Sequence, residues 1–340
     1  MRTRLPRWFR PGLLGSAVLY CSLWLVHPLQ AAEPQPVRPR IERLGTLDFG
    51  VSETTPVVFR DQLWRFEYIN RKYHRARVPV DYFQFINTQT GDATAPFALD
   101  HVLGSAHVEN DQMYVYGLRG GWGRDTLNVF WSADLTRWKT QEALRLPGYA
   151  LYNNSVCKGP DGFVMALEAG GPPEVVGERF TFFFALSDDL KTWRFLGPDV
   201  AWTKARYVGC PAIRYHDGHY YMLYLERIQP AAGRYVYRTD IVRSADLLQW
   251  EASPINPVLD FSEDDRAIRN PRINSEQQQR IKLAPTENIS DLDLAEFQGE
   301  VVLYYSWGSQ QGIEYLAEAR YKGTLGQFLT GFFPAKSPVK

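Results

Sequence analysis

Acidic residues recur at the ends of apolar, strand-like runs in this sequence. Five of them are candidates for chemistry at a shared site: Glu53, Glu168, Glu226, Asp291 and Asp293. Cleavage of a glycosidic bond needs two carboxyl groups that flank the bond, one protonated and one ionised. Carboxyl groups crowded at a partly enclosed site meet this need, because crowding raises the pKa of one of them. The pattern indicates acid–base hydrolysis, with a turn-capping carboxylate as the alternative for each residue.

We assign the catalytic roles to Asp291, Glu226 and Glu53. Glu226 follows the apolar run 220–225, which disfavours a charge, so its pKa should be raised and it is the expected general acid. Asp291 has polar neighbours and should stay charged as base or nucleophile. The remaining candidates are expected to bind substrate: His107, Asn154, Glu168, Asp293, Arg119 and Trp307.

Two of these candidates have a purely structural alternative. A single His in a strand is often a buried core residue, so His107 is either a sugar-binding donor or part of the core. Trp307 either stacks on a sugar face or packs between sheets.

The elements that must position these residues are β-hairpins. In the stretch 206–250, the apolar run 211–215 turns at His-Asp-Gly, residues 216–218, and returns through the aromatic-rich run 219–225. A third run, 235–243, completes a meander. Similar hairpins surround the turns at 60–62, 110–112, 160–162 and 298–299. The chain therefore contains five such hairpins.

A second repeat marks the end of the meander. The pattern Ser-x-Asp-Leu-x-x-Trp ends at Trp138, Trp193 and Trp250, and its serines are 55 and 57 residues apart. An all-strand repeat of this length is about one four-stranded propeller blade, and neighbouring blades cover each other's faces. The sequence predicts an all-β, five-bladed β-propeller. In such a fold the first strands line a central channel, and their starts meet the ends of the second strands at one mouth.

The N-terminus has the features of a secretory signal peptide. Arg2, Arg4, Arg7 and Arg10 precede an apolar stretch, and Ala31 and Ala32 provide a cleavage site. We expect a signal peptide at 1–32, a Pro-rich leader at 33–45 and the propeller domain at 46–340. The protein should then be secreted or periplasmic, with an uncleaved anchor as the alternative.

Composition excludes several partners and reaction classes. The chain has 38 basic and 38 acidic residues and no net charge, so neither nucleic acid nor, after signal cleavage, a membrane is an expected partner. The sequence has no zinc-type Cys/His spacing, no phosphate-binding Gly-rich loop and no Gly-x-Ser-x-Gly motif. We expect a carbohydrate substrate and no cofactor or metal, with Ca²⁺ in the channel and the oligomeric state left open. Cys157 and Cys210 are expected to be free thiols, with a disulfide between them as the alternative.

The Ser-x-Asp-Leu-x-x-Trp endings and the segment 209–221, GCPAIRYHDGHYY, resemble the five-bladed β-propeller glycoside hydrolases. This group includes arabinanases, β-xylosidases, invertases and anhydrogalactosidases. The resemblance covers roughly 46–333 and implies a glycoside hydrolase.

The resemblance also shows departures at the expected site. Those enzymes usually have an acidic residue before the proline of a first strand, where this chain has Gly209 and Cys210, and Asn154 stands at the corresponding place in the third blade. Asp291 matches the usual type, with Glu53 one residue out of step. The alternatives to a hydrolase are a non-catalytic carbohydrate-binding propeller and a protein-interaction propeller.

Overall fold

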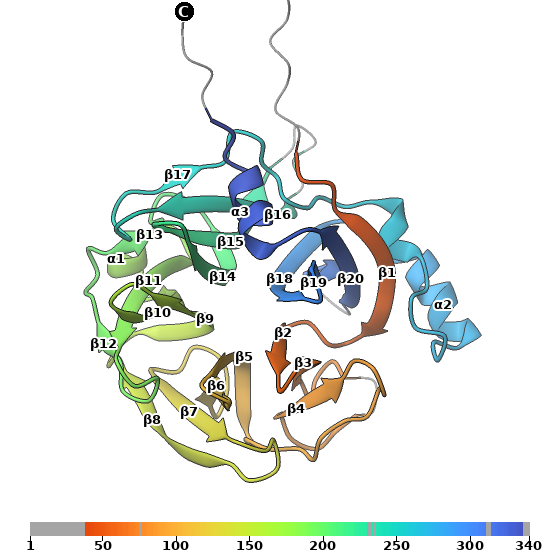
Figure 1. Ribbon diagram of the computed structural model, residues 1–340, viewed down its shortest axis with the longest axis horizontal. Helices are drawn as coiled ribbons and strands as arrows, with labels where there is room; N and C mark the ends of the chain where they lie inside the picture. The colour runs from red at the N-terminus through yellow and green to blue at the C-terminus, as the bar shows by residue number, and fades with distance from the viewer. Residues whose placement is uncertain (1–37, 75–76, 230–232, 234, 311–313, 336–340) are drawn as a thin grey trace, which may run out of the picture. The chain divides into compact units, whose positions relative to one another are not determined.

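The computed structural model describes residues 38–74, 77–229, 233, 235–310 and 314–335. Within them the chain forms five antiparallel sheets arranged around a central axis, which is a five-bladed β-propeller (Figure 1). The fold class predicted from the sequence is therefore confirmed. The predicted signal peptide and the start of the leader lie outside the described residues.

The blades follow one another along the chain. Blade 1 contains β2 (Thr54–Phe59), β3 (Gln62–Ile69) and β4 (Tyr82–Asn87), and blade 2 contains β5 (His101–Glu109), β6 (Gln112–Arg119), β7 (Thr126–Ser132) and β8 (Lys139–Arg145). Blade 3 contains β9 (Ala150–Gly159), β10 (Gly162–Gly171), β11 (Thr181–Ser187), β12 (Arg194–Phe195) and β13 (Ala201–Trp202). Blade 4 contains β14 (Val208–His216), β15 (His219–Ile228), β16 (Val236–Ser244) and β17 (Glu251–Ala252). The innermost strands of neighbouring blades contact one another in a ring: β2, β5, β9, β14 and β18.

Blade 5 joins the two ends of the described chain. It contains β18 (Asn288–Phe297), β19 (Glu300–Gly308), β20 (Tyr315–Lys322) and, as its outer strand, β1 (Glu42–Phe49), which pairs antiparallel with β20 (Figure 1). The ring is thus closed by pairing an early strand with a late one. Because β1 begins at Glu42, residues 42–45 belong to the sheet and not to the leader in which we had placed them.

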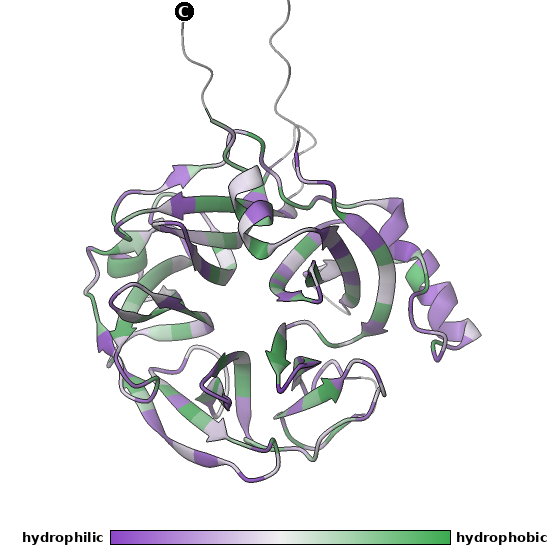
Figure 2. Cartoon of the chain, viewed as in Figure 1, coloured by the Kyte–Doolittle hydropathy of each residue, from purple (hydrophilic) through white to green (hydrophobic). Residues whose placement is uncertain are grey.

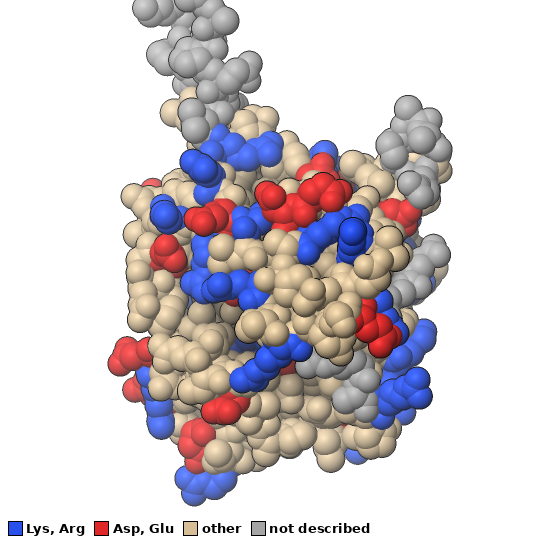
Figure 3. Space-filling model, turned by 90° about the vertical axis from the view of Figure 1, so that its right-hand side faces the viewer, with Lys and Arg blue, Asp and Glu red and all other residues tan. Residues whose placement is uncertain are grey.

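In the described part of the chain, four short helical elements lie outside the blades. They are α1 (Pro173–Val176), the 3-10 helix η1 (Glu263–Arg266), α2 (Ser275–Lys282) and α3 (Leu325–Gly331). Figure 2 shows that apolar residues gather on the strands, whereas α2 on the outside is largely hydrophilic. On the face seen in Figure 3, basic and acidic side chains are interspersed, consistent with the balanced charge of the sequence. Among the described residues no helix is long and apolar enough to span a membrane.

The repeated Ser-x-Asp-Leu-x-x-Trp pattern forms the same turn three times. In blade 2, the Asp134 carboxylate accepts hydrogen bonds from the backbone N–H groups of Thr136 and Arg137. The equivalent bonds recur at Asp189 and Asp246. The following leucine has a positive φ in each copy, between 59° and 64°, and is buried. The carboxylate satisfies the turn's donors, and this offsets the cost of the left-handed residue.

The tryptophan that ends each pattern packs against the preceding blade. Trp138 stacks on Phe97 beside blade 1 at 3.9 Å between ring centroids, and Trp250 stacks on Phe184 of blade 3 at 5.5 Å. Trp193 meets Tyr116 of blade 2 edge-on at 5.7 Å. The three tryptophans therefore occupy equivalent positions in successive blades, as expected for residues that end the same repeated pattern.

Candidate active site

One pocket, of about 310 Å³, opens where the five inner strands begin. Each blade contributes one residue to its lining from the start of its inner strand, one or two positions before regular pairing is established: Glu53, Leu103, Asn153, Cys210 and Asp291. A propeller brings these residues together although they span most of the sequence. The predicted convergence of inner strands at one mouth is thus observed.

A β-bulge aims three of these side chains. The pairing of β5, β14 and β18 with their neighbours shifts register at this position. Leu103, Cys210 and Asp291 have φ values of 55°, 55° and 49°, in the left-handed region that non-glycine residues rarely adopt. Bulges re-aim side chains, and such backbone outliers cluster at functional sites.

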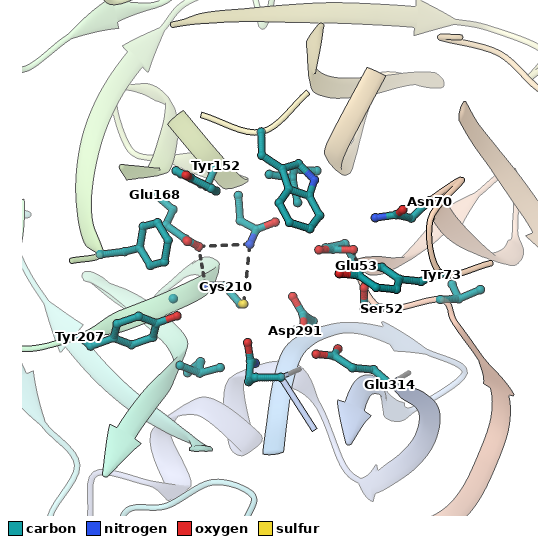
Figure 4. A pocket seen from close by; sticks show the side chains of 18 of the residues that line it. Ser52, Glu53, Asn70, Tyr73, Tyr152, Glu168, Tyr207, Cys210, Asp291 and Glu314 are labelled. Carbon is teal, nitrogen blue, oxygen red and sulfur yellow. Dashed lines mark hydrogen bonds between the residues drawn. The ribbon is translucent and has the colours of Figure 1, made fainter. Parts of the chain in front are cut away.

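Four carboxyl groups line the pocket. Glu53 and Asp291 come from the inner positions of blades 1 and 5, Glu314 directly precedes β20, and Glu168 lies on β10, the second strand of blade 3. Figure 4 shows Glu168 on one side and the other three grouped across the pocket from it. The site therefore has carboxyl groups on two facing sides.

Glu168 is held by hydrogen bonds to one of its two oxygens. Its Oε2 accepts from the backbone N–H of Cys210 at 2.8 Å and from the Asn153 amide at 3.2 Å (Figure 4). Burial raises the pKa of Glu168 to about 7, although these two bonds favour its charged form and oppose the effect. The group can hold a proton near neutral pH.

The three facing carboxyl groups interact with one another. Burial raises the pKa of Asp291, while hydrogen bonds from the Ser290 hydroxyl, at 2.6 Å, and from the Cys210 thiol favour its ionised form. Burial raises the pKa of Glu53, and the Asp291 charge adds to this effect. The same two causes raise the pKa of Glu314 well above its usual value. The Asp291 charge thus disfavours ionisation of Glu53 and Glu314.

Glu314 brings an unused acceptor to this group. Its Oε2 is buried and has no hydrogen-bond partner within the described part of the chain. A buried oxygen without a partner is costly unless a ligand satisfies it. A substrate hydroxyl is a suitable donor.

Aromatic rings form the walls. Five line the pocket: Tyr73, Trp122, Tyr152, Phe180 and Tyr207. The ring centroids of Tyr152 and Phe180 are 4.6 Å apart, and those of Phe180 and Tyr207 are 5.4 Å apart. Rings with one polar edge are suited to stacking on sugar faces.

The structure brings Glu53, Glu168 and Asp291 together but leaves the six other predicted residues outside the pocket, and three of these six come from the ends of second strands. Glu168 and Leu225 face the pocket from their second strands, whereas Glu226 lies one residue beyond Leu225. Arg119 and Trp307 are likewise one residue past the inward-facing position. Since successive side chains of a strand point to opposite faces, all three point away from the channel.

Each of the three has a different environment. The Glu226 carboxylate pairs with the Arg206 guanidinium at 2.9 Å and accepts from the Tyr224 hydroxyl, and it does not reach the pocket where we had placed it as general acid. Trp307 is completely buried, with its ring 4.8 Å from that of Tyr315, so it packs within the protein and cannot stack on a sugar. Arg119 is exposed at the end of β6 and does not line the pocket.

The remaining predicted residues lie further along the channel. The Asn154 amide oxygen accepts from Ser105 at 2.6 Å, and Asp293 pairs with Arg214 at 2.5 Å, both beside a space of about 30 Å³ beneath the pocket floor. His107 lines a separate cavity at the opposite end of the inner strands, where burial and then Arg214 lower its pKa to about 4. None of the three lines the pocket that holds the carboxyl groups.

The residues missed by the sequence analysis are Glu314, Asn153 and Cys210 as members of the site. Asn153 directly precedes Asn154, which we had chosen, and Cys210 stands at a position that we had aligned but treated only as a departure from the related enzymes. Both cysteines in the described region are free. No group of three or more His, Cys, Asp or Glu side chains among the described residues is arranged to hold a metal ion.

Comparison with solved structures places this architecture among known folds. A structure described as a glycoside hydrolase matches 89% of this chain and 95% of its own, with a TM-score of 0.57 and 14% identity. The chain has the fold of the five-bladed β-propeller glycoside hydrolases. A thermostable family-43 glycoside hydrolase matches 85% of this chain and 94% of its own, with a TM-score of 0.57 and 12% identity.

A third structure of this fold is an exo-1,5-α-L-arabinanase from a bovine ruminal metagenomic library. It matches 81% of this chain and 93% of its own, with a TM-score of 0.52 and 11% identity. No protein-family model and no curated sequence matches the chain. The resemblance found in the sequence is therefore supported by structure, at the level of the fold.

Proposed function

We propose that the protein is a secreted glycoside hydrolase that uses Glu168 as general acid and Asp291 as general base or nucleophile. The observation that carries this proposal is the placement of Glu168 across the pocket from Asp291 (Figure 4). A sugar bound between them would have a proton donor on one side and an ionised carboxylate on the other, as glycosidic cleavage requires. Solved glycoside hydrolases of the same fold support this reaction class.

Glu168 is suited to donate the proton. Both of its hydrogen bonds are to Oε2, so Oε1 is left to carry a proton towards the leaving oxygen. A pKa of about 7 keeps the proton in place near neutral pH while still allowing its transfer. The backbone bond from Cys210 fixes the orientation of the group.

Asp291 is suited to the opposite role. Hydrogen bonds from Ser290 and Cys210 favour its ionised form, and its charge raises the pKa of neighbouring Glu53 and Glu314. Protonated Glu53 and Glu314 would then bind sugar hydroxyls. The assignment replaces the Glu226 acid inferred from the sequence.

A non-catalytic carbohydrate-binding propeller is the second candidate. It is favoured by Asn153 and Cys210, which occupy the inner-strand pocket positions of blades 3 and 4, where blades 1 and 5 have carboxyl groups. Such a protein would keep the aromatic walls and bind a glycan without cleaving it.

A screen of the purified protein against a polysaccharide panel tests the two candidates. On any glycan that is cleaved, Glu168→Gln and Asp291→Asn should each lower turnover at least about 10²-fold. Glu142→Gln, which changes an exposed carboxylate on β8, is the matched control and should retain the parent rate. Wild-type rates in both pocket variants would refute the assignment, and glycan binding without cleavage by the parent protein would favour the second candidate.

A further inference from the structure

The pocket carries an arginine whose charge no described carboxylate neutralises through an ion pair. Arg179 lines the pocket, is exposed, and has no carboxylate partner within the part of the chain that the structure describes. Its guanidinium donates one hydrogen bond, to the Tyr152 hydroxyl at 2.5 Å. Because a guanidinium has five N–H donors in a planar fork, most of them are left for a ligand.

The position of this guanidinium is fixed by packing. It lies over the Phe180 ring at 4.5 Å and the Tyr152 ring at 5.5 Å from the respective centroids. Gly170 on β10 leaves the space for it, since a Cβ there would come within 2.4 Å of Phe180 and 2.9 Å of the Arg179 Nε. An exposed arginine on a surface usually moves freely, whereas this one is held against an aromatic wall.

The aromatic wall continues outward from Arg179 along the edge of blade 4. Tyr207 follows Phe180, and Tyr237 follows Tyr207 at 6.1 Å between ring centroids. The Arg227 guanidinium lies 4.4 Å from the centroid of Tyr207 and pairs with Glu178, so its charge is already neutralised. We call the four rings Tyr152, Phe180, Tyr207 and Tyr237, with Arg179, the rim strip. Figure 4 shows two of its members, Tyr152 and Tyr207, on the same side of the pocket as Glu168.

The charges divide the site into two regions. The pocket itself holds four carboxyl groups, and the charge of Asp291, the proposed base or nucleophile, disfavours an anionic sugar at the point of cleavage. The Arg179 cation lies on the rim strip beside Glu168, the side from which the proposed proton donor approaches the leaving group. A neutral sugar therefore suits the pocket and an anionic sugar suits the strip.

We propose that the rim strip binds the glycan beyond the scissile bond and that Arg179 selects a substrate with an anionic group, a carboxylate or a sulfate, on the sugar next to the cleaved residue. The position of the anionic sugar relative to the cleaved bond rests on the proposed glycosidase function. The binding preference itself is independent of that function. A planar guanidinium can hold either anion through two parallel hydrogen bonds.

The test uses acidic glycans paired with their neutral counterparts. Uronic acid oligosaccharides are compared with their carboxyl-reduced forms, and sulfated galactan oligosaccharides with their desulfated forms, by calorimetric titration of the full protein. At least one acidic probe should bind about 10- to 100-fold more tightly than its counterpart, the range for a charge-assisted hydrogen bond. The pair that shows the preference identifies the anion.

Three variants separate charge from stacking. Arg179→Gln should abolish the preference, so that the acidic probe binds no more tightly than the neutral one, whereas Tyr207→Ala should weaken both probes alike and keep the preference. Arg137→Gln, which alters an exposed arginine on the blade 2 turn, is the control and should change neither.

Two outcomes would overturn the inference. One is that no acidic probe is preferred over its neutral counterpart, and the other is that Arg179→Gln weakens both members of a pair equally. A protein that shows the preference but cleaves no glycan would contradict the proposed function and leave the selectivity of Arg179 standing. Cleavage of neutral glycans without any acidic preference would do the reverse.

Discussion

Replacing Glu168 by Gln should stabilise the folded protein at alkaline pH and change its stability little near pH 5. In the unfolded chain this carboxyl loses its proton near the ordinary Glu pKa of 4.5, whereas burial raises the pKa to about 7 in the folded protein. The folded state binds the proton more tightly, so stability falls as pH rises from 4.5 to about 7 and stays low above it. Gln cannot ionise and avoids this loss.

The size of the effect follows from the two pKa values. Each pKa unit corresponds to about 1.4 kcal/mol, so ionising Glu168 in the folded protein costs on the order of 3 kcal/mol. The packing should be preserved, because the carbonyl oxygen of Gln can accept the bonds now made by Cys210 and Asn153. The gain should therefore appear as pH rises through the window and reach its full value above about pH 7.

Urea unfolding of both proteins at about pH 5 and about pH 9 measures this difference. Glu142→Gln is the control: its carboxylate is exposed and Arg145 lowers its pKa, so its removal should give no gain at high pH. A stability difference that is the same at both pH values would refute the reasoning, as would a Glu168→Gln protein that is less stable at high pH. The same variant should lose its activity, because the buried Glu168 carboxyl that destabilises the fold at high pH is the group proposed to act in catalysis.

Two further predictions concern the fold and the export of the chain. Trp193→Ala should lower the free energy of unfolding by about 3 to 5 kcal/mol, because the ring is buried between blades 2 and 3; a cost below about 1 kcal/mol would contradict this packing. The exported protein should begin at Ala32 or Glu33, and N-terminal sequencing that returns Met1 would show that the signal is not cleaved.

The architecture could be predicted from sequence because its signals are local. Each hairpin turn carries its own residues, such as Asp217-Gly218 with φ values of 44° and 77°, and each blade ends in a turn whose donors one aspartate satisfies. Turn motifs of this kind can be recognised in the sequence without knowing which distant residues contact one another. The count of five hairpins then gave the number of blades.

The site was harder to predict because it depends on register. At the three bulges the left-handed position is held by Leu103, Cys210 or Asp291 and not by a glycine, so the sequence does not mark it, and aligning hairpins on their turns misplaces the residues beyond. On the second strands an error of one residue selected Glu226, which points away from the pocket, where Leu225 faces it. Glu314 precedes β20, the third strand of blade 5. An alignment of hairpins covers only the first two strands of each blade and could not identify it.

Closure of the ring by β1 makes assembly of the site depend on both ends of the chain. The backbone N–H of Gly50, just after β1, donates to the carbonyl oxygen of Glu314 at 2.8 Å, and Glu314 leads into β20, the strand that β1 pairs with. During synthesis the segment 42–49 must wait for 315–322 before it finds its partner, and such distant pairing is slow. The carboxyl groups of blade 5 are therefore positioned only after β1 has paired with β20. A chain that lacks either β1 or β20 would still contain most of the propeller but would have no complete active site, so activity requires the full-length fold.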